Sequence, residues 1–183
     1  MCCVYKKNNV LISSKLHPQN IQVVKTRCMF RDVSINLFNN IDPNIISNKT
    51  ACVVLQYPDT FGNIDNYTEI IAKAKHMGSK VILVTDPLAL SFLKSPGDLG
   101  ADIAVGTMQR FGIPMFFGGP HASYLACTSE LLRYVPGRIV GTSKDRLGNE
   151  VYRLALQTRE QHIKKQNAIS NICTSQSLLA ILS

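Results

Sequence analysis

Polar side chains follow two strand-like runs of this sequence, at the points where the runs end. Asp86 comes after "KVILVT", and Gln109 and Arg110 come just after "ADIAVGT". Ligands of an open α/β sheet bind beyond the carboxyl ends of its strands, so these side chains could hold a small cofactor. The alternatives are structural: Asp86 would cap the helix that follows it, and Gln109 and Arg110 would form a polar corner.

A Gly-rich turn with a histidine, "GGPHA", follows this polar pair. It lacks the spacing of the G-x-G-x-x-G and G-x-x-x-x-G-K-[ST] phosphate loops, and its glycines favour a close approach of two backbones instead. His121 has no Cys or acidic neighbour in the sequence, so a role as a ligand or an acid–base group is the less favoured interpretation.

Motifs for nucleophilic catalysis and metal binding are absent from the sequence. It contains no G-x-S-x-G, and its six cysteines form no C-x-x-C pair and lie at no metal-binding spacing from a histidine. Cys52 and Cys127 lie in apolar runs typical of core positions. We expect no metal site and no disulfides, which fits a reducing compartment.

Basic residues outnumber acidic ones and give a formal net charge of +8. Three interpretations stay open: a solvated face, a surface for phosphate groups or an acidic partner, and, least favoured, a nucleic-acid surface. Arg159, His162 and Lys165 fall near one face of a predicted helix, which is either solvated or turned to a partner. The densest basic cluster consists of Arg138, Lys144, Arg146, Arg153, Arg159, Lys164 and Lys165.

The elements that would position these side chains alternate between strands and helices. Apolar spacing predicts one helix near 18–30, with Pro18 in its first turn, and another over 64–78, with Asp65 as its cap. This order is the βαβ signature of an α/β fold with a mainly parallel sheet and flanking helices. The predicted strands are "NNVLISS", "DVSINLF", "KTACVVLQY", "SKVILVT", "ADIAVGT" and "SYLACT".

Shorter elements fill the remaining segments. The stretches "PLALSFLKS" and "SELLRYVP" are predicted to be short helices, the second capped by Thr128 or Ser129, and "PGDLG" is predicted to be a turn. The runs "GRIVGTS" and "EVYRLAL" predict a hairpin joined by "KDRLGN". The tail after Thr158, a predicted helix cap, is expected to be helical in part.

The length of 183 residues suffices for one domain with a core, and no apolar run approaches the length of a membrane span. The N-terminus lacks the apolar region of a secretory signal. The sequence opens directly into strand-like residues and stops within the apolar run "SLLAILS". We therefore expect residues 1–183 to form a partial domain, truncated at both ends.

Four long stretches resemble the glycine cleavage system P-protein family, the decarboxylating glycine dehydrogenases. They are "HPQNIQVVKTR", "QYPDTFGNIDNYTEI", "PGDLGADIAVGTMQRFGIPMFFGGPHASYLA" and the stretch from "PGRIVGTSKD" to "SNICTSQSLLA". The resemblance runs from about residue 10 to the end and corresponds to an internal part of the family's amino-terminal half. Its most specific segments are "ALQTREQHI" and "SNICTSQ".

The resemblance implies an enzyme that uses pyridoxal phosphate (PLP) to decarboxylate glycine and passes the aminomethyl group to a lipoyl group on H-protein. It implies a fold like part of the large domain of aspartate-aminotransferase-like PLP enzymes (fold type I). The lysine that binds PLP is expected in the family's second half, in a segment resembling "HKTF", and therefore outside this chain.

In this sequence "MQRF" occupies the place of that segment, so Gln109 stands where the lysine would be. Asp86 falls near the place of the aspartate that pairs with the pyridine nitrogen, although the spacing differs by a few residues. A Gln amide cannot form an imine with an aldehyde. The resemblance therefore makes Asp86, Gln109, Arg110 and His121 candidates for a degenerate cofactor site, with no catalytic residue in this chain.

The resemblance further implies that this half helps to wall the active site of the other half. Arg153, Arg159 and His162 are our candidates for that wall or for a partner surface. The expected partners are the carboxyl-terminal half of P-protein and lipoylated H-protein, in a homo- or heterodimer, with neither nucleic acid nor membrane. We expect no activity from the chain alone, and a mitochondrial location in a eukaryote or a cytoplasmic one in a bacterium. The alternative is a non-catalytic pseudo-subunit of the same complex.

Overall fold

The computed structural model describes residues 1–135, 137–157, 160–168 and 176–183. The chain divides into two compact units, the first formed by Met1–Cys127 with Gln176–Ser183 and the second by Thr128–Ser175.

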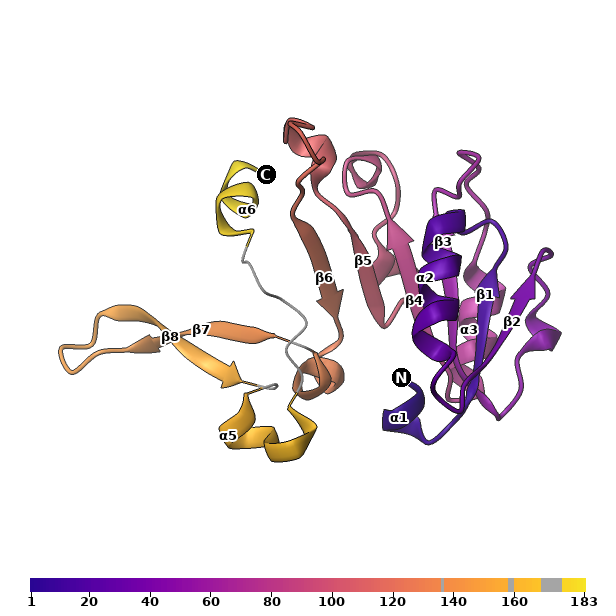
Figure 1. The fold of residues 1–183 in the computed structure, drawn as a ribbon, viewed down its shortest axis with the longest axis horizontal. Coiled ribbons are helices and arrows are strands. Elements are labelled where there is room, and N and C mark those ends of the chain that lie inside the picture. Colours follow the sequence, from indigo (N-terminus) through magenta and orange to yellow (C-terminus); the bar gives the residue numbers. More distant parts are fainter. Residues whose placement is uncertain (136, 158–159, 169–175) are drawn as a thin grey trace. The chain divides into compact units, whose positions relative to one another are not determined.

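A six-stranded sheet in the order β2-β1-β3-β4-β5-β6 forms the centre of the first unit (Figure 1). The first five strands along the chain run parallel to their neighbours, and β6 runs antiparallel to β5. The mainly parallel sheet predicted from the sequence is therefore confirmed. The strands are β1 Asn9–Ser13, β2 Ser34–Phe38, β3 Thr50–Tyr57, β4 Lys80–Thr85, β5 Ile103–Thr107 and β6 Ser123–Cys127.

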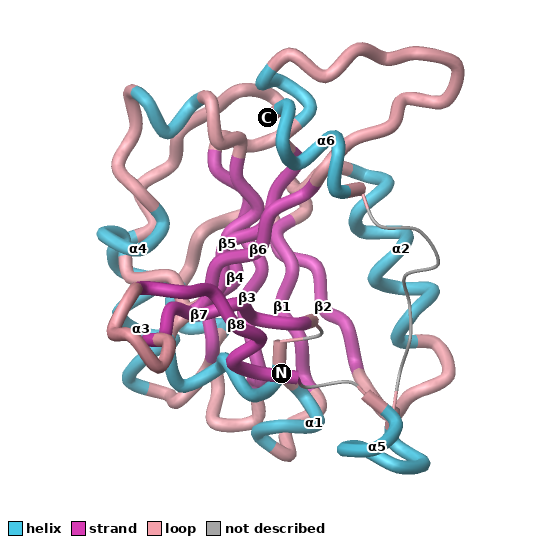
Figure 2. Tube along the Cα trace, turned by 90° about the vertical axis from the view of Figure 1, so that its left-hand side faces the viewer, coloured by secondary structure: helices cyan, strands magenta, loops and turns pink. Residues whose placement is uncertain are grey.

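Two helices lie on opposite faces of this sheet, as Figure 2 shows: α2 (Pro18–Cys28) and α3 (Thr68–His76). Side chains of a strand point to alternate faces, so each strand contributes to two cores. On the α3 face, Ile70, Ile71 and Ala74 pack with the buried strand residues Leu11, Val53, Leu55, Val81 and Leu83. On the α2 face, Ile21 packs with Val10, Ile12, Cys52 and Val54.

The start of α3 differs from its prediction. Asp65 does not cap this helix, because its carboxylate binds Lys15, and Asn66 Oδ1 instead accepts a hydrogen bond from the Thr68 backbone N–H at 3.0 Å. Tyr67, just before the helix, is buried, and its hydroxyl donates to the Gln56 carbonyl at 2.9 Å. The helix therefore begins at Thr68, while Gly78 follows its end with a positive φ of 63°, as predicted.

Several short elements also differ from their predictions. The stretch "PGDLG", expected to be a turn, forms a one-turn helix, and "PLALSFLKS" forms only one 3-10 turn. The helix Pro96–Leu99 forms because the Ser95 hydroxyl accepts a hydrogen bond from the Asp98 N–H and so caps its N-terminus. The short elements of the first unit are α1 Cys2–Tyr5, η1 Pro43–Ile45, η2 Ala89–Ser91, α4 Pro96–Leu99, η3 Gln109–Phe111 and α6 Ser177–Leu182.

The second unit contains the predicted hairpin, β7 (Arg138–Lys144) paired antiparallel with β8 (Glu150–Gln157). The predicted helix "SELLRYVP" is the 3-10 helix η4 (Ser129–Tyr134), and neither Thr128 nor Ser129 caps it through a side chain. Two short helices, α5 (Gln161–Lys164) and η5 (Lys165–Asn167), follow the hairpin. Thr158, the predicted cap of the tail, lies outside the described residues.

Candidate functional site

The parallel strands of the first unit end at one edge of the sheet, called here the carboxyl edge. Asp86 directly follows β4, and Arg110 lies in η3, just after β5. His121 precedes β6, which starts at the same edge because it runs antiparallel to β5. The fold thus places Asp86, Arg110 and His121 in the lining of one pocket of about 700 Å³.

The floor of this pocket is the sheet face that α2 leaves open. Val54, Ile82, Val84 and Val105 contribute apolar side chains from three neighbouring strands. The α2 residue Val23 lines one wall. The pocket is therefore apolar along the strands and polar at the carboxyl edge.

Asp86 is held by two interactions within the chain. Its Oδ2 atom pairs with Arg110 Nη1, and its Oδ1 atom accepts a hydrogen bond from the Leu88 backbone N–H at 3.0 Å. The carboxylate therefore stabilises the turn after β4 and also ties that turn to η3. Each of its oxygens thus has one partner within the chain, and the negative charge is balanced by Arg110.

Gln109 folds back onto its own turn. Its Nε2 donates to the Ile113 carbonyl at 2.8 Å and lies 3.5 Å from Met115 Sδ. Its Oε1 is buried and has no hydrogen-bond partner among the residues that the structure describes. The side chain thus shapes the loop after β5, and it does not line the 700 Å³ pocket. His121 likewise has a local contact, from Nδ1 to the Gly119 carbonyl at 3.1 Å.

The close packing of β4, β5 and β6 near this edge depends on a glycine. A Cβ on Gly106 would lie 2.2 Å from the Thr85 carbonyl oxygen and 2.6 Å from Tyr124 Cε1. The Tyr124 hydroxyl binds the Thr85 hydroxyl and lies 3.4 Å from the Thr85 carbonyl. Gly106 therefore lets the Tyr124 ring cross β5 and link β6 to β4.

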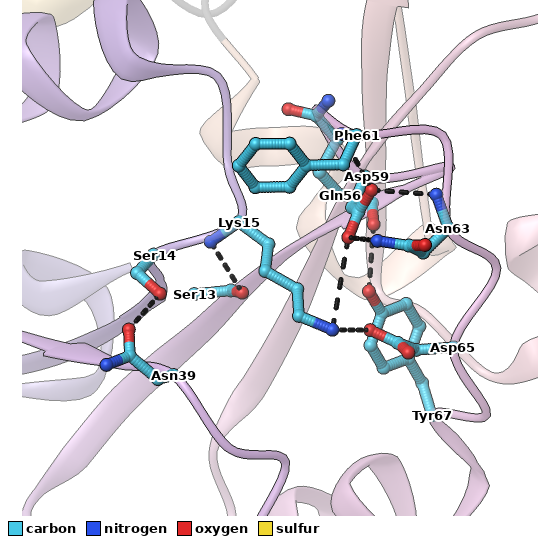
Figure 3. A network of polar contacts seen from close by, with 10 residues as sticks. All are labelled: Ser13, Ser14, Lys15, Asn39, Gln56, Asp59, Phe61, Asn63, Asp65 and Tyr67. Carbon is cyan, nitrogen blue, oxygen red and sulfur yellow. Dashed lines mark hydrogen bonds and ion pairs between the residues drawn. The ribbon is translucent and has the colours of Figure 1, made fainter.

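A second polar cluster at the carboxyl edge joins the ends of β1 and β3 (Figure 3). Lys15 Nζ donates to Asp65 Oδ2 at 2.6 Å and lies 3.9 Å from Asp59 Oδ2. The hydrogen bond to Asp65 raises the pKa of Lys15 above its ordinary value, although burial opposes the shift. Lys15 is therefore an ammonium group at neutral pH.

Asp59 organises the loop that follows β3. Its Oδ1 accepts hydrogen bonds from the backbone N–H groups of Phe61 and Asn63, both at 2.8 Å, and its Oδ2 accepts one from Asn63 Nδ2 at 2.9 Å. Burial of Asp59 opposes its charge, but these hydrogen bonds and nearby Lys15 outweigh it and lower the pKa of the carboxyl.

The hairpin of the second unit repeats this arrangement. Asp145 Oδ1 accepts from the N–H groups of Leu147 and Asn149 at 2.7 and 2.9 Å, and its Oδ2 accepts from Asn149 Nδ2 at 3.0 Å. Both loops share the pattern D-x-x-G-N, "DTFGN" and "DRLGN". This pattern was the available sequence signal for Asp59, because Asp and Asn side chains bind nearby backbone groups in turns.

The described residues of the carboxyl edge do not fit a PLP site. An imine requires an uncharged amine, whereas Gln109 offers an amide and Lys15 is held protonated by Asp65. A partner for the pyridine nitrogen requires a carboxylate whose charge is not already neutralised, whereas the Asp86 carboxylate is paired with Arg110. The pocket can therefore pack against an apolar group, but its side chains offer no means of capturing an aldehyde.

The predicted wall residues belong to the second unit. Arg153 is exposed on β8, opposite Gly141 of β7, and His162 is exposed on α5. Arg159 lies outside the described residues. In the same unit, Arg138 Nε donates to Glu160 Oε1 at 2.8 Å. These positions keep Arg153 and His162 available as surface candidates.

The described residues contain neither a metal-binding cluster nor a membrane-spanning helix. No group of three or more His, Cys, Asp or Glu residues among them is arranged to hold a metal ion. None of the helices within the described ranges is long and apolar enough to cross a membrane.

Comparison with known sequences finds one family over almost the whole chain. Residues 2–183 match the family model described as glycine cleavage system P-protein. The chain is 48% identical over 179 residues to a glycine dehydrogenase (decarboxylating) of Akkermansia muciniphila, and 50% identical over 175 residues to one of Brucella canis. These matches cover 97% and 96% of this chain but only 19% and 18% of the two relatives.

Comparison with solved structures agrees. The chain superposes with a TM-score of 0.89 and 33% identity on a glycine decarboxylase (P-protein) of the glycine cleavage system in inhibitor-bound form, covering 99% of this chain and 42% of that one. It also resembles O-acetylhomoserine sulfhydrylase of Wolinella succinogenes, with a TM-score of 0.56 and 11% identity over 69% of this chain and 36% of that one. The second likeness concerns the fold, which is that of fold type I enzymes.

Proposed function

Because the chain belongs to the glycine cleavage system P-protein family, we propose that it is part of an enzyme that decarboxylates glycine. In this proposal the whole enzyme uses PLP and passes the aminomethyl group to lipoylated H-protein. The lysine that binds PLP lies outside residues 1–183, which represent an internal part of the amino-terminal half. The chain alone is inactive.

The observation that carries this proposal is the amide of Gln109 at the end of β5. Its nitrogen donates to the Ile113 carbonyl, 2.8 Å away, and therefore has a structural task in the turn. The neighbouring Arg110 holds the Asp86 carboxylate. A site that offers neither a free amine nor a free carboxylate supports a scaffolding role for this edge, with the chemistry performed elsewhere in the enzyme.

The partners in this proposal are the remaining parts of P-protein, in a homo- or heterodimer, and lipoylated H-protein. Arg153, Arg159 and His162 are proposed to face a partner or to wall the active site. We propose a cytoplasmic location in a bacterium and a mitochondrial one in a eukaryote.

The proposal can be tested by grafting residues 2–183 into the full-length Brucella canis relative in place of the matching segment. The graft is expected to exchange labelled bicarbonate with the carboxyl group of glycine in the presence of lipoylated H-protein, and the isolated chain is expected not to. Borohydride reduction of the PLP-loaded graft, followed by mass spectrometry, should place the pyridoxyl label on a lysine outside the grafted residues. A specific label on a lysine within them would refute the proposal.

The alternative, a non-catalytic pseudo-subunit, makes a different prediction for the same graft. A pseudo-subunit would fold and assemble with H-protein but would not support exchange. The 48–50% identity to two decarboxylating glycine dehydrogenases favours the enzyme.

A further inference from the structure

Exposed phenylalanines gather on the loops that follow three neighbouring strands. The sequence has seven phenylalanines, and five of them lie in such loops. Phe61 follows β3, Phe92 follows β4, and Phe111, Phe116 and Phe117 follow β5. All five are exposed, Phe61 by 77% and Phe117 completely. Soluble monomers rarely leave so much aromatic surface uncovered on one side, so these loops are expected to meet a partner.

The backbone of the Phe61 loop is held by hydrogen bonds within the chain. Asp59 accepts three hydrogen bonds from Phe61 and Asn63, and the Thr60 N–H donates to the Lys15 carbonyl at 3.1 Å. Figure 3 shows that the hydrogen bonds of this network do not involve the Phe61 ring. A loop whose backbone is already held in place loses little conformational entropy on binding, which favours its exposed side chain as an anchor.

The loop of Phe117 is also constrained. The Gly119 N–H donates to the Met115 carbonyl at 2.7 Å, and Gln109 Nε2 donates to the Ile113 carbonyl at 2.8 Å. Ile113 packs with the α6 residue Leu179, which fixes the base of the loop within the first unit. The backbone bonds of this loop thus turn Phe117 outward while its base stays buried.

Two ion pairs lie beside the loops of Phe61 and Phe117. Lys15 pairs with Asp65, and Arg110 pairs with Asp86. Each pair has no net charge, and the exposed Lys94, which is outside these two pairs, lies near Phe92 in the sequence. An apolar partner surface fits this edge better than an acidic or a basic one.

We propose that Phe61 and Phe117 anchor the carboxyl edge in apolar pockets of the downstream part of the P-protein polypeptide. This inference rests on the proposed function. The occupant follows from length: the matched relatives extend far beyond this chain, which covers only 18–19% of them. The same polypeptide or complex is therefore the nearest source of an apolar surface for these side chains.

The test uses this chain and the part of the Brucella canis relative that follows the matching segment, produced as a separate polypeptide. Binding is measured by sedimentation for the wild type and for Phe61→Ser, Phe117→Ser and Phe30→Ser. Phe30 is the matched control, because it is 88% exposed but follows α2, away from the loops at the carboxyl edge. Circular dichroism checks that each variant keeps the wild-type fold.

Phe61→Ser and Phe117→Ser are each expected to weaken binding by about tenfold or more, and Phe30→Ser to leave it unchanged. Equal binding by all variants, equal weakening by Phe30→Ser, or no binding by the wild type would overturn the proposal. Self-association of the chain through the same phenylalanines, in place of binding, would also overturn it.

The outcomes separate this inference from the proposed function. Binding that depends on Phe61 and Phe117 supports the docking surface, even if the assembled enzyme does not exchange glycine carboxyl groups. Exchange activity that survives both substitutions in the grafted full-length protein, with unchanged thermal stability, refutes the docking surface and leaves the proposed function standing.

Discussion

The paired loops "DTFGN" and "DRLGN" allow a direct test of what burial adds to a hydrogen-bonded turn. Asp59 and Asp145 accept the same three hydrogen bonds, at 2.8 to 2.9 Å in the first loop and 2.7 to 3.0 Å in the second. They differ in environment, because Asp59 is only 5% exposed and Asp145 is an exposed hairpin residue. The perturbation is therefore Asp59→Ala, with Asp145→Ala as its matched control.

The expected cost for Asp59 follows from its partners. A hydrogen bond to a charged group contributes about 1.5–3 kcal/mol, and the three bonds to Asp59 are partly buried. The three bonds of this ring share one carboxylate and do not add independently, so we expect Asp59→Ala to lower the free energy of unfolding by about 3 kcal/mol. For a chain of this length that is a fall in Tm of roughly 6–12 °C.

Urea unfolding followed by far-UV circular dichroism measures both variants, with the near-UV signal of the buried Tyr57 and Tyr67 as a marker for the first unit. Asp145→Ala is expected to cost clearly less, because water can replace the lost carboxylate at an exposed turn. If the two substitutions cost the same, the reasoning that burial strengthens the ring is wrong.

The pH dependence of the same residue gives a second measure. The hydrogen bonds lower the pKa of Asp59 in the folded state, so the Asp59 carboxylate stabilises the folded chain at a pH above its unfolded pKa of about 3.9. This stabilisation is lost as the pH falls through the folded pKa. Asp59→Asn is expected to remove this part of the acid dependence, and an unchanged acid profile would contradict the assignment.

Three further predictions follow from the packing of the first unit. Gly106→Ala is expected to lower the free energy of unfolding by about 1–3 kcal/mol or more, whereas Gly118→Ala, whose Cβ meets no atom within 4 Å, is expected to have little effect in the same urea assay. Burial raises the pKa of Cys52 to about 12, so mass spectrometry should find it unalkylated by iodoacetamide at pH 8 until the chain unfolds. The bond to Asp65 raises the pKa of Lys15, so the Lys15 ammonium stabilises the fold below its unfolded pKa of about 10.4. This stabilisation is lost as the pH rises through the folded pKa. The stability of Lys15→Met, measured against pH in the alkaline range, should not show that loss.

The strands were predictable because the sequence signals that mark them are local. The runs "TACVVLQY" and "KVILVT" are rich in β-branched residues and form β3 and β4 as expected. Pro18 and Gly78 likewise marked the start of α2 and the end of α3. These elements depend on backbone preferences that neighbouring residues determine.

The polar contacts of the carboxyl edge were not predictable in the same way, since they join residues far apart in the chain. Lys15 and Asp65 are 50 positions apart, and Asp86 and Arg110 are 24 apart. Local pattern assigned Asp65 to a helix cap, but a cation from the end of β1 competes for its carboxylate in the folded chain. Only the order of strands in the sheet brings such pairs together.

The reversal of direction between β5 and β6 has a consequence for how this protein can change over evolution. Thr107 pairs with Ser123, and the Met108 N–H donates to the Ala122 carbonyl at 2.9 Å. The two ends of the connecting loop are therefore hydrogen-bonded to each other at the carboxyl edge. Residues between these hydrogen-bonded ends can be exchanged, added or lost without altering the register of β5 and β6. The register of β5 and β6 therefore does not depend on the length of this loop, whereas Gln109 and Ile113 within it are held by contacts of their own.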